Sequence, residues 1–328
     1  MIEAKRMETV TLNNGIIEAV FLNYGATVIS LRFLPLNRNL IVSYKNLEAY
    51  KENPVYLGST VGPLAGRMSG PSIMSAGTEH LLSKHQNGEH LHGGIHGTTH
   101  QYFDTTTANN SVLFHGTFDH REDGYPGKVT YEIGYRLDGN TLVMTQTASP
   151  EYPMPLNLTN HMYFNLAGSD CLDDHWLKID SDKVAEVGED KVNSGVMLSV
   201  DATVFDFRTL QKLSEILKAS HEQFAITGHI DHAFLFNSKH HLTLKCDDMA
   251  MTLTTTCPAV QIYLANYFDA SFTNQNGTYA QNHSAIALEP QHIPNEWNYD
   301  QTYQNYTSKR GYRETTHYTF TALKNQNP

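Results

Sequence analysis

The feature that most constrains the fold of this 328-residue chain is a succession of short strand-like runs. Each run is rich in β-branched and aromatic residues and is bounded by Gly, Asn, Asp or Pro, which is typical of strands separated by turns. The runs occupy residues 26–34, 111–119, 128–137, 141–149, 231–237, 241–246, 250–257, 259–266, 284–290 and 317–324. Asp138-Gly139-Asn140 is suited to a compact hairpin turn. The pattern therefore predicts an all-β fold, either a large antiparallel sandwich or a barrel.

Helical periodicity is scarce, and residues 209–220 are its best example. The apolar face there consists of Leu210, Leu213, Ile216 and Leu217. Thr209 is suited to cap this helix. No βαβ alternation, fixed-period repeat or linker-like change of composition appears. We expect one domain over residues 1–328 with few short helices.

Charge and cysteine content narrow the class of protein. The formal net charge is −11 and the acidic residues are spread along the chain, which argues against nucleic acid or an anionic membrane as a partner. No apolar run is long enough for a membrane helix, and the first ten residues do not resemble a signal peptide. Cys171, Cys246 and Cys257 are far apart and form no C-x-x-C pair. We expect a cytoplasmic protein, either a monomer or a homodimer.

Several catalytic motifs are missing from the sequence. There is no G-x-G-x-x-G, no G-x-x-x-x-G-K-[ST], no H-E-x-x-H and no G-x-S-x-G. Nucleotide cofactors, zincin chemistry and serine-hydrolase chemistry are therefore disfavoured. The expected chemistry uses side chains alone or a metal ion.

Histidines are concentrated in one stretch of the chain. The histidines between positions 80 and 100 are His80, His85, His90, His92, His96 and His100. His90 and His92 are two residues apart, so on a strand both could ligate one metal ion, as in cupins. A cupin-like site usually has a carboxylate a few residues later, and here the first is Asp104. A metal site, a catalytic site and an ordinary loop all stay open, and we interpret His96 and His100 as loop histidines.

Polar residues also stand in otherwise apolar or glycine-rich stretches. These are Arg67 in "YLGSTVGPLAGRMSG", His161 and Asn165 in "LNLTNHMYFNLAGS", Asp231 in "GHIDHAFLF" and Glu289 in "SAIALEPQHIPN". A carboxylate that closes a buried strand, as Glu289 does, is either a paired structural charge or a catalytic group.

Taken together, these stretches resemble one known family. The order "LNNGIIEAVFLNYGATVISL", "GPLAGR", "HLHGG", "NLTNHMYFNLAG", "GHIDHAF" and "ALEPQHIPN" is similar to that of the aldose 1-epimerases, or mutarotases. The resemblance implies a large antiparallel β-supersandwich with a carbohydrate cleft. It also implies an isomerase, without cofactor or metal, that interconverts the α- and β-anomers of a free aldohexose such as galactose or glucose.

The resemblance also assigns roles to individual residues. It implies that Glu289 is the general base and His161 the general acid, and that Arg67, His92 and Asp231 bind the sugar. To the expected substrate-binding residues we add His90, because its spacing from His92 would let both face the sugar, and Asn165, from the same stretch as His161.

The chain departs from the family's usual motifs at two places. Pro63 and Gly66 stand where an arginine and an asparagine are common, and Glu89 stands where an asparagine is common. These departures bear on sugar specificity. Two alternatives therefore stay open: an epimerase or binding protein for a modified sugar such as a hexose phosphate, and a metal-dependent cupin-like enzyme that uses His90 and His92.

The proposed acid and base also lead to an expectation about pH. The working form needs Glu289 ionised and His161 protonated. Because negative charge on Glu289 and Asp231 would favour the imidazolium, we expect a raised pKa for His161. A bell-shaped pH profile of kcat/KM with a basic limb above about pH 7 would follow.

Overall fold

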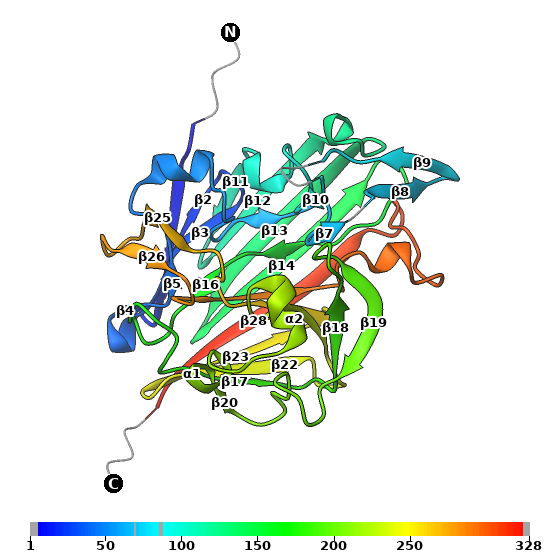
Figure 1. Cartoon of the computed structure of the whole chain (residues 1–328). Helices are drawn as coiled ribbons and strands as arrows, with labels where there is room; N and C mark the ends of the chain where they lie inside the picture. Colours follow the sequence, from blue (N-terminus) through cyan, green and yellow to red (C-terminus); the bar gives the residue numbers. More distant parts are fainter. Residues whose placement is uncertain (1–5, 69, 85–87, 324–328) are drawn as a thin grey trace.

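The computed structural model describes residues 6–68, 70–84 and 88–323, and two large antiparallel sheets dominate it. The first sheet has nine strands in the order β11 (Asp104–Ala108), β12 (Ser111–Asp119), β13 (Lys128–Asp138), β14 (Thr141–Pro150), β28 (Tyr312–Ala322), β23 (Met249–Thr255), β22 (His241–Lys245), β17 (Trp176–Ile179) and β20 (Gln211–Lys212). Its long strands β13, β14 and β28 run side by side across the molecule (Figure 1).

The second sheet has seven strands and carries the site described below. Their order is β19 (Asn193–Ser199), β18 (Lys183–Val187), β21 (Asp231–Leu235), β24 (Ala259–Tyr263), β27 (Ile286–Gln291), β16 (Tyr163–Phe164) and β5 (Ile41–Val42). Inward-facing residues of both sheets, such as Val112 and Ile133 of the first and Ile262 and Leu288 of the second, belong to one hydrophobic cluster. The sheets therefore share a core, and the predicted all-β supersandwich is confirmed.

Smaller sheets and short helices complete the chain. The four-stranded sheet consists of β1 (Thr9–Asn13), β2 (Ile17–Leu22), β3 (Thr27–Phe33) and β4 (Arg38–Asn39). The strand pairs are β6 (Thr60–Val61) with β15 (Thr159–Asn160), β7 (Arg67–Met68) with β10 (His90–Leu91), β8 (Ser72–Ser75) with β9 (Thr78–Leu81), and β25 (Asp269–Thr273) with β26 (Tyr279–Gln281). The α-helices are α1 (Leu213–Ile216) and α2 (Glu222–Thr227), and 3₁₀ turns cover Leu34–Leu36, Leu47–Lys51, Thr98–His100, Arg121–Asp123 and Glu296–Asn298.

The longest predicted strands agree best with the structure. Strand β12 begins and ends at the predicted residues, and β13 and β14 extend one residue beyond theirs. Every second residue of β13 is buried, because successive side chains of a strand point to opposite faces. Gly139, in the hairpin between them, adopts a φ of 56°, as the predicted turn requires.

The prediction of a helix over residues 209–220 is wrong in extent. Gln211 and Lys212 pair with β17 as strand β20, so the helix begins only at Leu213 and Lys212 takes the cap position predicted for Thr209. Leu210 is 46% exposed, whereas Leu213 is fully buried. Pairing to a sheet edge thus shortens the helix to four residues. No helix in the described ranges is long and apolar enough to cross a membrane.

Candidate active site

A pocket lies over one face of the seven-stranded sheet. Its wall consists of Pro54, Val55, Tyr56, Gly66, Arg67, Leu91, His92, His161, Tyr163, Val187, Lys191, Asn193, Asp231, Gln261, Tyr263, Tyr267, Glu289, Gln291 and Pro294. The empty volume, including the open mouth, is about 860 Å³.

Strand register brings the polar floor of the pocket together. Glu289 and Gln291 are two residues apart on β27, so their side chains point to the same face. Gln261 of β24 is the direct cross-strand partner of Glu289, and Asp231 begins the next strand, β21. Three neighbouring strands therefore present two carboxyl groups and two carboxamides to one space.

His161 and Glu289 meet at the bottom of the pocket. His161 Nε2 lies 3.4 Å from Glu289 Oε1, and both side chains are almost completely buried. The His161 backbone is fixed, because its N–H donates to the Ser59 carbonyl and its carbonyl accepts from the Gly58 N–H, each at 2.9 Å. Two ionisable side chains that are far apart in the sequence are thus brought into contact.

Aromatic rings fix the orientation of the His161 imidazole. The Tyr163 ring stacks on it at a centroid distance of 4.8 Å, and the Tyr56 ring stacks at 6.1 Å. His92 meets it edge-on at 5.4 Å. This packing keeps water from the imidazole and holds Nε2 toward Glu289.

Burial determines the protonation of the pair, and it corrects the expected direction for His161. Desolvation lowers the pKa of His161 to about 3 instead of raising it. Burial, and then the charge of Asp231, raises the pKa of Glu289 well above its usual value. Burial also raises the pKa of Asp231. The lowered pKa of His161 and the raised pKa of Glu289 both favour the proton on Glu289, so the pair rests with a neutral imidazole and a protonated Glu289 carboxyl group.

Two hydrogen bonds organise the charged groups around the pair. Gln261 Nε2 donates to Asp231 Oδ1 at 2.7 Å, which orients the carboxyl group toward the pocket. Arg67 Nη1 donates to Glu89 Oε2 at 2.6 Å, with both side chains mostly buried. Glu89 is one of the departures from the family's usual motif, and it compensates the charge of Arg67.

The orientation of His92 depends on Gly66, which is another position where the chain departs from the family's usual motif. The Gly66 N–H donates to His92 Nδ1 at 3.2 Å, so in the neutral imidazole the proton is on Nε2. Gly66 has a φ of 89°, and a Cβ there would lie 2.3 Å from the Cβ of Pro294. Because Pro294 fills the space of a side chain at position 66, only glycine fits, and its backbone orients His92.

His90 and Asn165 lie away from the pocket wall. The His90 ring is fully buried, with Nδ1 2.8 Å from the Ser83 carbonyl and Nε2 2.8 Å from the Tyr125 hydroxyl. The expectation that His90 faces the sugar beside His92 is therefore wrong. Strand β10 ends at Leu91 and His92 adopts a φ of 51°, so the alternation of a strand does not continue to His92.

Asn165 organises a loop instead of facing the pocket. Its Nδ2 donates to the carbonyls of Ser169, Cys171 and Ser284, and its Oδ1 accepts from the Gly168 N–H. The structure therefore corrects its expected substrate-binding role, because every polar atom of the side chain is used within the fold.

The histidine-rich stretch contains no metal cluster among the residues that the structure describes. No group of three or more His, Cys, Asp or Glu side chains is placed to hold an ion there. His96 is exposed and its Nε2 lies 3.2 Å from Glu122, as a loop histidine would. His85 and Asn87 lie outside the described residues.

Several wall residues were not predicted from the sequence. Gln261 and Gln291 are such residues, although strand alternation from Glu289 would have placed Gln291 on the same face. Lys191 and Tyr56 come from loops, and both adopt a positive φ. Lys191 Nζ lies 3.1 Å from the Tyr267 hydroxyl at the wall. No periodic signal in the sequence marks a loop residue of this kind.

Comparison with known proteins identifies the family. The sequence profile described as aldose 1-epimerase matches residues 8–321. Galactose mutarotase from Homo sapiens is 28% identical over 303 residues, covering 89% of this chain and 87% of that protein. Aldose 1-epimerase from Escherichia coli strain K12 is 30% identical over 308 residues, covering 90% and 88%.

Solved structures agree with the sequence comparison. An aldose epimerase homologue from C. elegans superposes with a TM-score of 0.90 at 25% identity, covering 97% of this chain and all of that one. Galactose 1-epimerase from Lactobacillus acidophilus NCFM gives 0.86 at 27% identity, covering 99% and 97%. The chain belongs to the aldose 1-epimerase family, a family of isomerases.

Proposed function

We propose that this chain is a mutarotase that interconverts the α- and β-anomers of a free aldohexose such as galactose or glucose. The observation that carries the proposal is the buried contact of 3.4 Å between His161 Nε2 and Glu289 Oε1 in a pocket lined by polar and aromatic side chains. The names of the relatives, galactose mutarotase and aldose 1-epimerase, support the same reaction.

The reaction requires two proton movements, and the pair supplies both. An aldose ring is a hemiacetal. Glu289 accepts the proton of the anomeric hydroxyl while His161 donates a proton to the ring oxygen, so the bond from C1 to the ring oxygen breaks and a C1 carbonyl forms. Rotation about the bond between C1 and C2 exposes the other face of the aldehyde. Ring closure then reverses both transfers and gives the other anomer.

The pair holds one proton throughout this cycle. With the ring closed, the proton is on His161; with the ring open, it is on Glu289. The resting protein, with a neutral His161 and a protonated Glu289, has the protonation of the open-chain stage. Binding of the ring form therefore requires a proton shift from Glu289 to His161 across the contact between them. No other reactant is consumed.

The remaining wall residues are proposed to bind hydroxyl groups. Asp231 accepts, His92 Nε2 donates, and Arg67 offers guanidinium N–H groups beside its bond to Glu89. Because Glu89 neutralises Arg67, this guanidinium attracts a phosphate group less than an unpaired one would, which favours a neutral sugar over a hexose phosphate. We propose that residues 1–328 form one catalytic domain. The three free cysteines suit the cytoplasm, and a monomer and a homodimer are both compatible with this site.

Polarimetry on freshly dissolved α-anomers tests the proposal. The chain is expected to accelerate the change in optical rotation of galactose or glucose well beyond the buffer rate. The panel should include xylose and a hexose 6-phosphate, with Glu289→Gln as the matched inactive variant. If no sugar in the panel mutarotates faster with the wild-type protein than with Glu289→Gln, the proposed function is wrong.

A further inference from the structure

We propose that Gln291 is a substrate-positioning residue that binds a sugar hydroxyl through its side-chain carboxamide. The proposal rests on the proposed function, because it adds a contact in the same pocket. Gln291 lies at the end of β27, two residues after Glu289, and is 1% exposed. It lines the pocket, and its cross-strand partner is the small Ala259.

The carboxamide of Gln291 is buried but not hydrogen-bonded within the protein. Neither Oε1 nor Nε2 has a partner in the part of the chain that the structure describes. Burial of an unpaired amide is unfavourable, so such groups are usually hydrogen-bonded. Gln291 lines the pocket beside Glu289, whose Oε2 is likewise buried without a partner among the described residues. A ligand with hydroxyl groups would satisfy these atoms.

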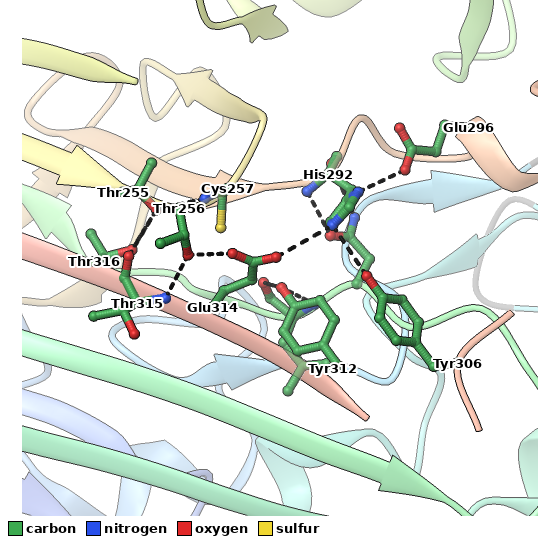
Figure 2. Close-up of polar contacts among 12 residues, drawn as sticks. Thr255, Thr256, Cys257, His292, Glu296, Tyr306, Tyr312, Glu314, Thr315 and Thr316 are labelled. Atoms are coloured by element: carbon green, nitrogen blue, oxygen red, sulfur yellow. Dashed lines mark hydrogen bonds and ion pairs between the residues drawn. The ribbon is translucent and has the colours of Figure 1, made fainter. Parts of the chain in front are cut away.

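The next residue, His292, differs from Gln291 because its side chain has hydrogen-bond partners within the protein. His292 points to the opposite side of the strand end, where its ring lies between Glu296 and Glu314 and near the Tyr306 hydroxyl (Figure 2). Its backbone N–H and carbonyl are both bonded to the Asn157 side chain. The backbone beside Gln291 is therefore anchored, which holds the carboxamide in place.

The chemistry of a carboxamide matches that of a sugar hydroxyl. Gln291 offers an acceptor at Oε1 and donors at Nε2, and a hydroxyl can donate and accept. The group is neutral and does not titrate, so it leaves the protonation of Glu289 and His161 unchanged. It can therefore orient the ring relative to the acid–base pair without taking part in proton transfer.

An unpaired amide alone does not identify such a contact. Gln146 on β14 is also 1% exposed and its Nε2 has no partner among the described residues, but it belongs to the other large sheet and does not line the pocket. It provides a matched control, because the same substitution there removes a buried carboxamide without removing a pocket group.

The test combines Gln291→Met with a set of monodeoxy sugars. We expect Gln291→Met to lower kcat/KM for the parent sugar about ten- to thirtyfold, mainly through KM, since the hydrogen bond exists in ground and transition states. For one deoxy sugar, the kcat/KM of the wild type should fall by a similar factor relative to the parent sugar. The kcat/KM of Gln291→Met should not fall further with that deoxy sugar. Gln146→Met should keep the wild-type kcat/KM.

Three results would decide against the proposal. The first is an unchanged kcat/KM in Gln291→Met. The second is that, for every deoxy sugar, the loss of kcat/KM from the missing hydroxyl is as large in Gln291→Met as in the wild type. The third is an equal loss of kcat/KM in Gln146→Met. If Gln291→Met fails to fold by thermal denaturation, Gln291→Asn, which keeps a shortened carboxamide, takes its place with the same criterion. An inactive wild type would instead refute the proposed function, so the two failures are distinguishable.

Discussion

Buried His161 and partly exposed His292, which lie on either side of β27, have opposite pKa shifts. His161 faces the pocket, and burial lowers its pKa to about 3. For His292, burial acts in the same direction, but hydrogen bonds to Glu296 and Glu314 outweigh it and raise the pKa to about 9. His292 belongs to a saturated polar cluster (Figure 2). His161 instead meets the Glu289 carboxyl group, whose pKa is raised well above its usual value.

The difference shows how to separate a structural polar group from a functional one in this fold. The His292 cluster uses its hydrogen-bonding capacity within the protein and ties the end of β27 to β28 through Glu314. The pocket face leaves His161 Nδ1, Glu289 Oε2 and the Gln291 carboxamide without partners in the described ranges. Substitutions on the pocket face should therefore change the rate, and substitutions in the cluster should change the stability.

The largest expected effect is that of Glu289→Gln. Glutamine keeps the shape of the side chain but neither accepts nor returns the proton, so kcat should fall about 10²–10⁴-fold. The free energy of unfolding should stay equal or rise, because a poorly solvated carboxyl group is removed. Polarimetry and thermal denaturation measure the two. Retention of most of the rate would show that Glu289 is not the base.

His161→Asn should have the next largest effect, about 10²–10³-fold on kcat with a smaller change in KM. The imidazole proton is needed when the ring oxygen departs, not when the sugar binds. Steady-state polarimetry separates the two constants. A change confined to KM would make His161 a binding residue and would remove the contrast with His292.

His292→Gln should have the opposite effect, a loss of stability with little change in kcat. Its folded pKa of about 9 is above the unfolded value of about 6.5, so its stabilisation is complete below about pH 6.5 and is lost as pH rises through 9. The variant should lose roughly 3 kcal/mol of unfolding free energy at pH 6 and little at pH 10. The kcat of the folded variant should stay within about threefold of wild type. Urea unfolding at both pH values measures this, and a pH-independent loss would contradict it.

Glu89→Gln should have the smallest effect. Glutamine keeps an acceptor for Arg67 but removes the compensating charge, so KM for a neutral hexose should rise only about two- to fivefold with kcat unchanged. Inhibition by a hexose 6-phosphate should become stronger, because Arg67 then carries an uncompensated charge. Inhibition constants measured on both proteins check this. Equal inhibition of the two proteins would show that Glu89 does not exclude anions.

The sequence predicts the fold more completely than the site. Long strands such as β12 and β13 follow from local alternation, which depends only on neighbouring residues. The 209–220 helix was overpredicted because pairing of Gln211 and Lys212 with β17 is a tertiary contact. His161 and Glu289 could be chosen from the family motifs, but their contact depends on strand pairing between distant segments.

Protonation was the least predictable property of the site. His161 was expected to have a raised pKa because two carboxyl groups are nearby, and the structure gives the opposite direction because the imidazole is itself buried. His90 was misplaced because a strand ended one residue before the motif did. Both errors concern the surroundings of a side chain, which residue identity and spacing do not specify.

The protonation of the two histidines tests the account most directly. Nitrogen NMR of side-chain-labelled histidines, assigned with His161→Asn and His292→Gln, reports the charge of each ring as pH is varied. We predict that at pH 7 His161 is neutral and His292 is cationic, that His292 loses its proton near pH 9, and that His161 gains one only as pH approaches 3. A His161 that titrates at or above about 6.5, the value of a free histidine, would contradict the account.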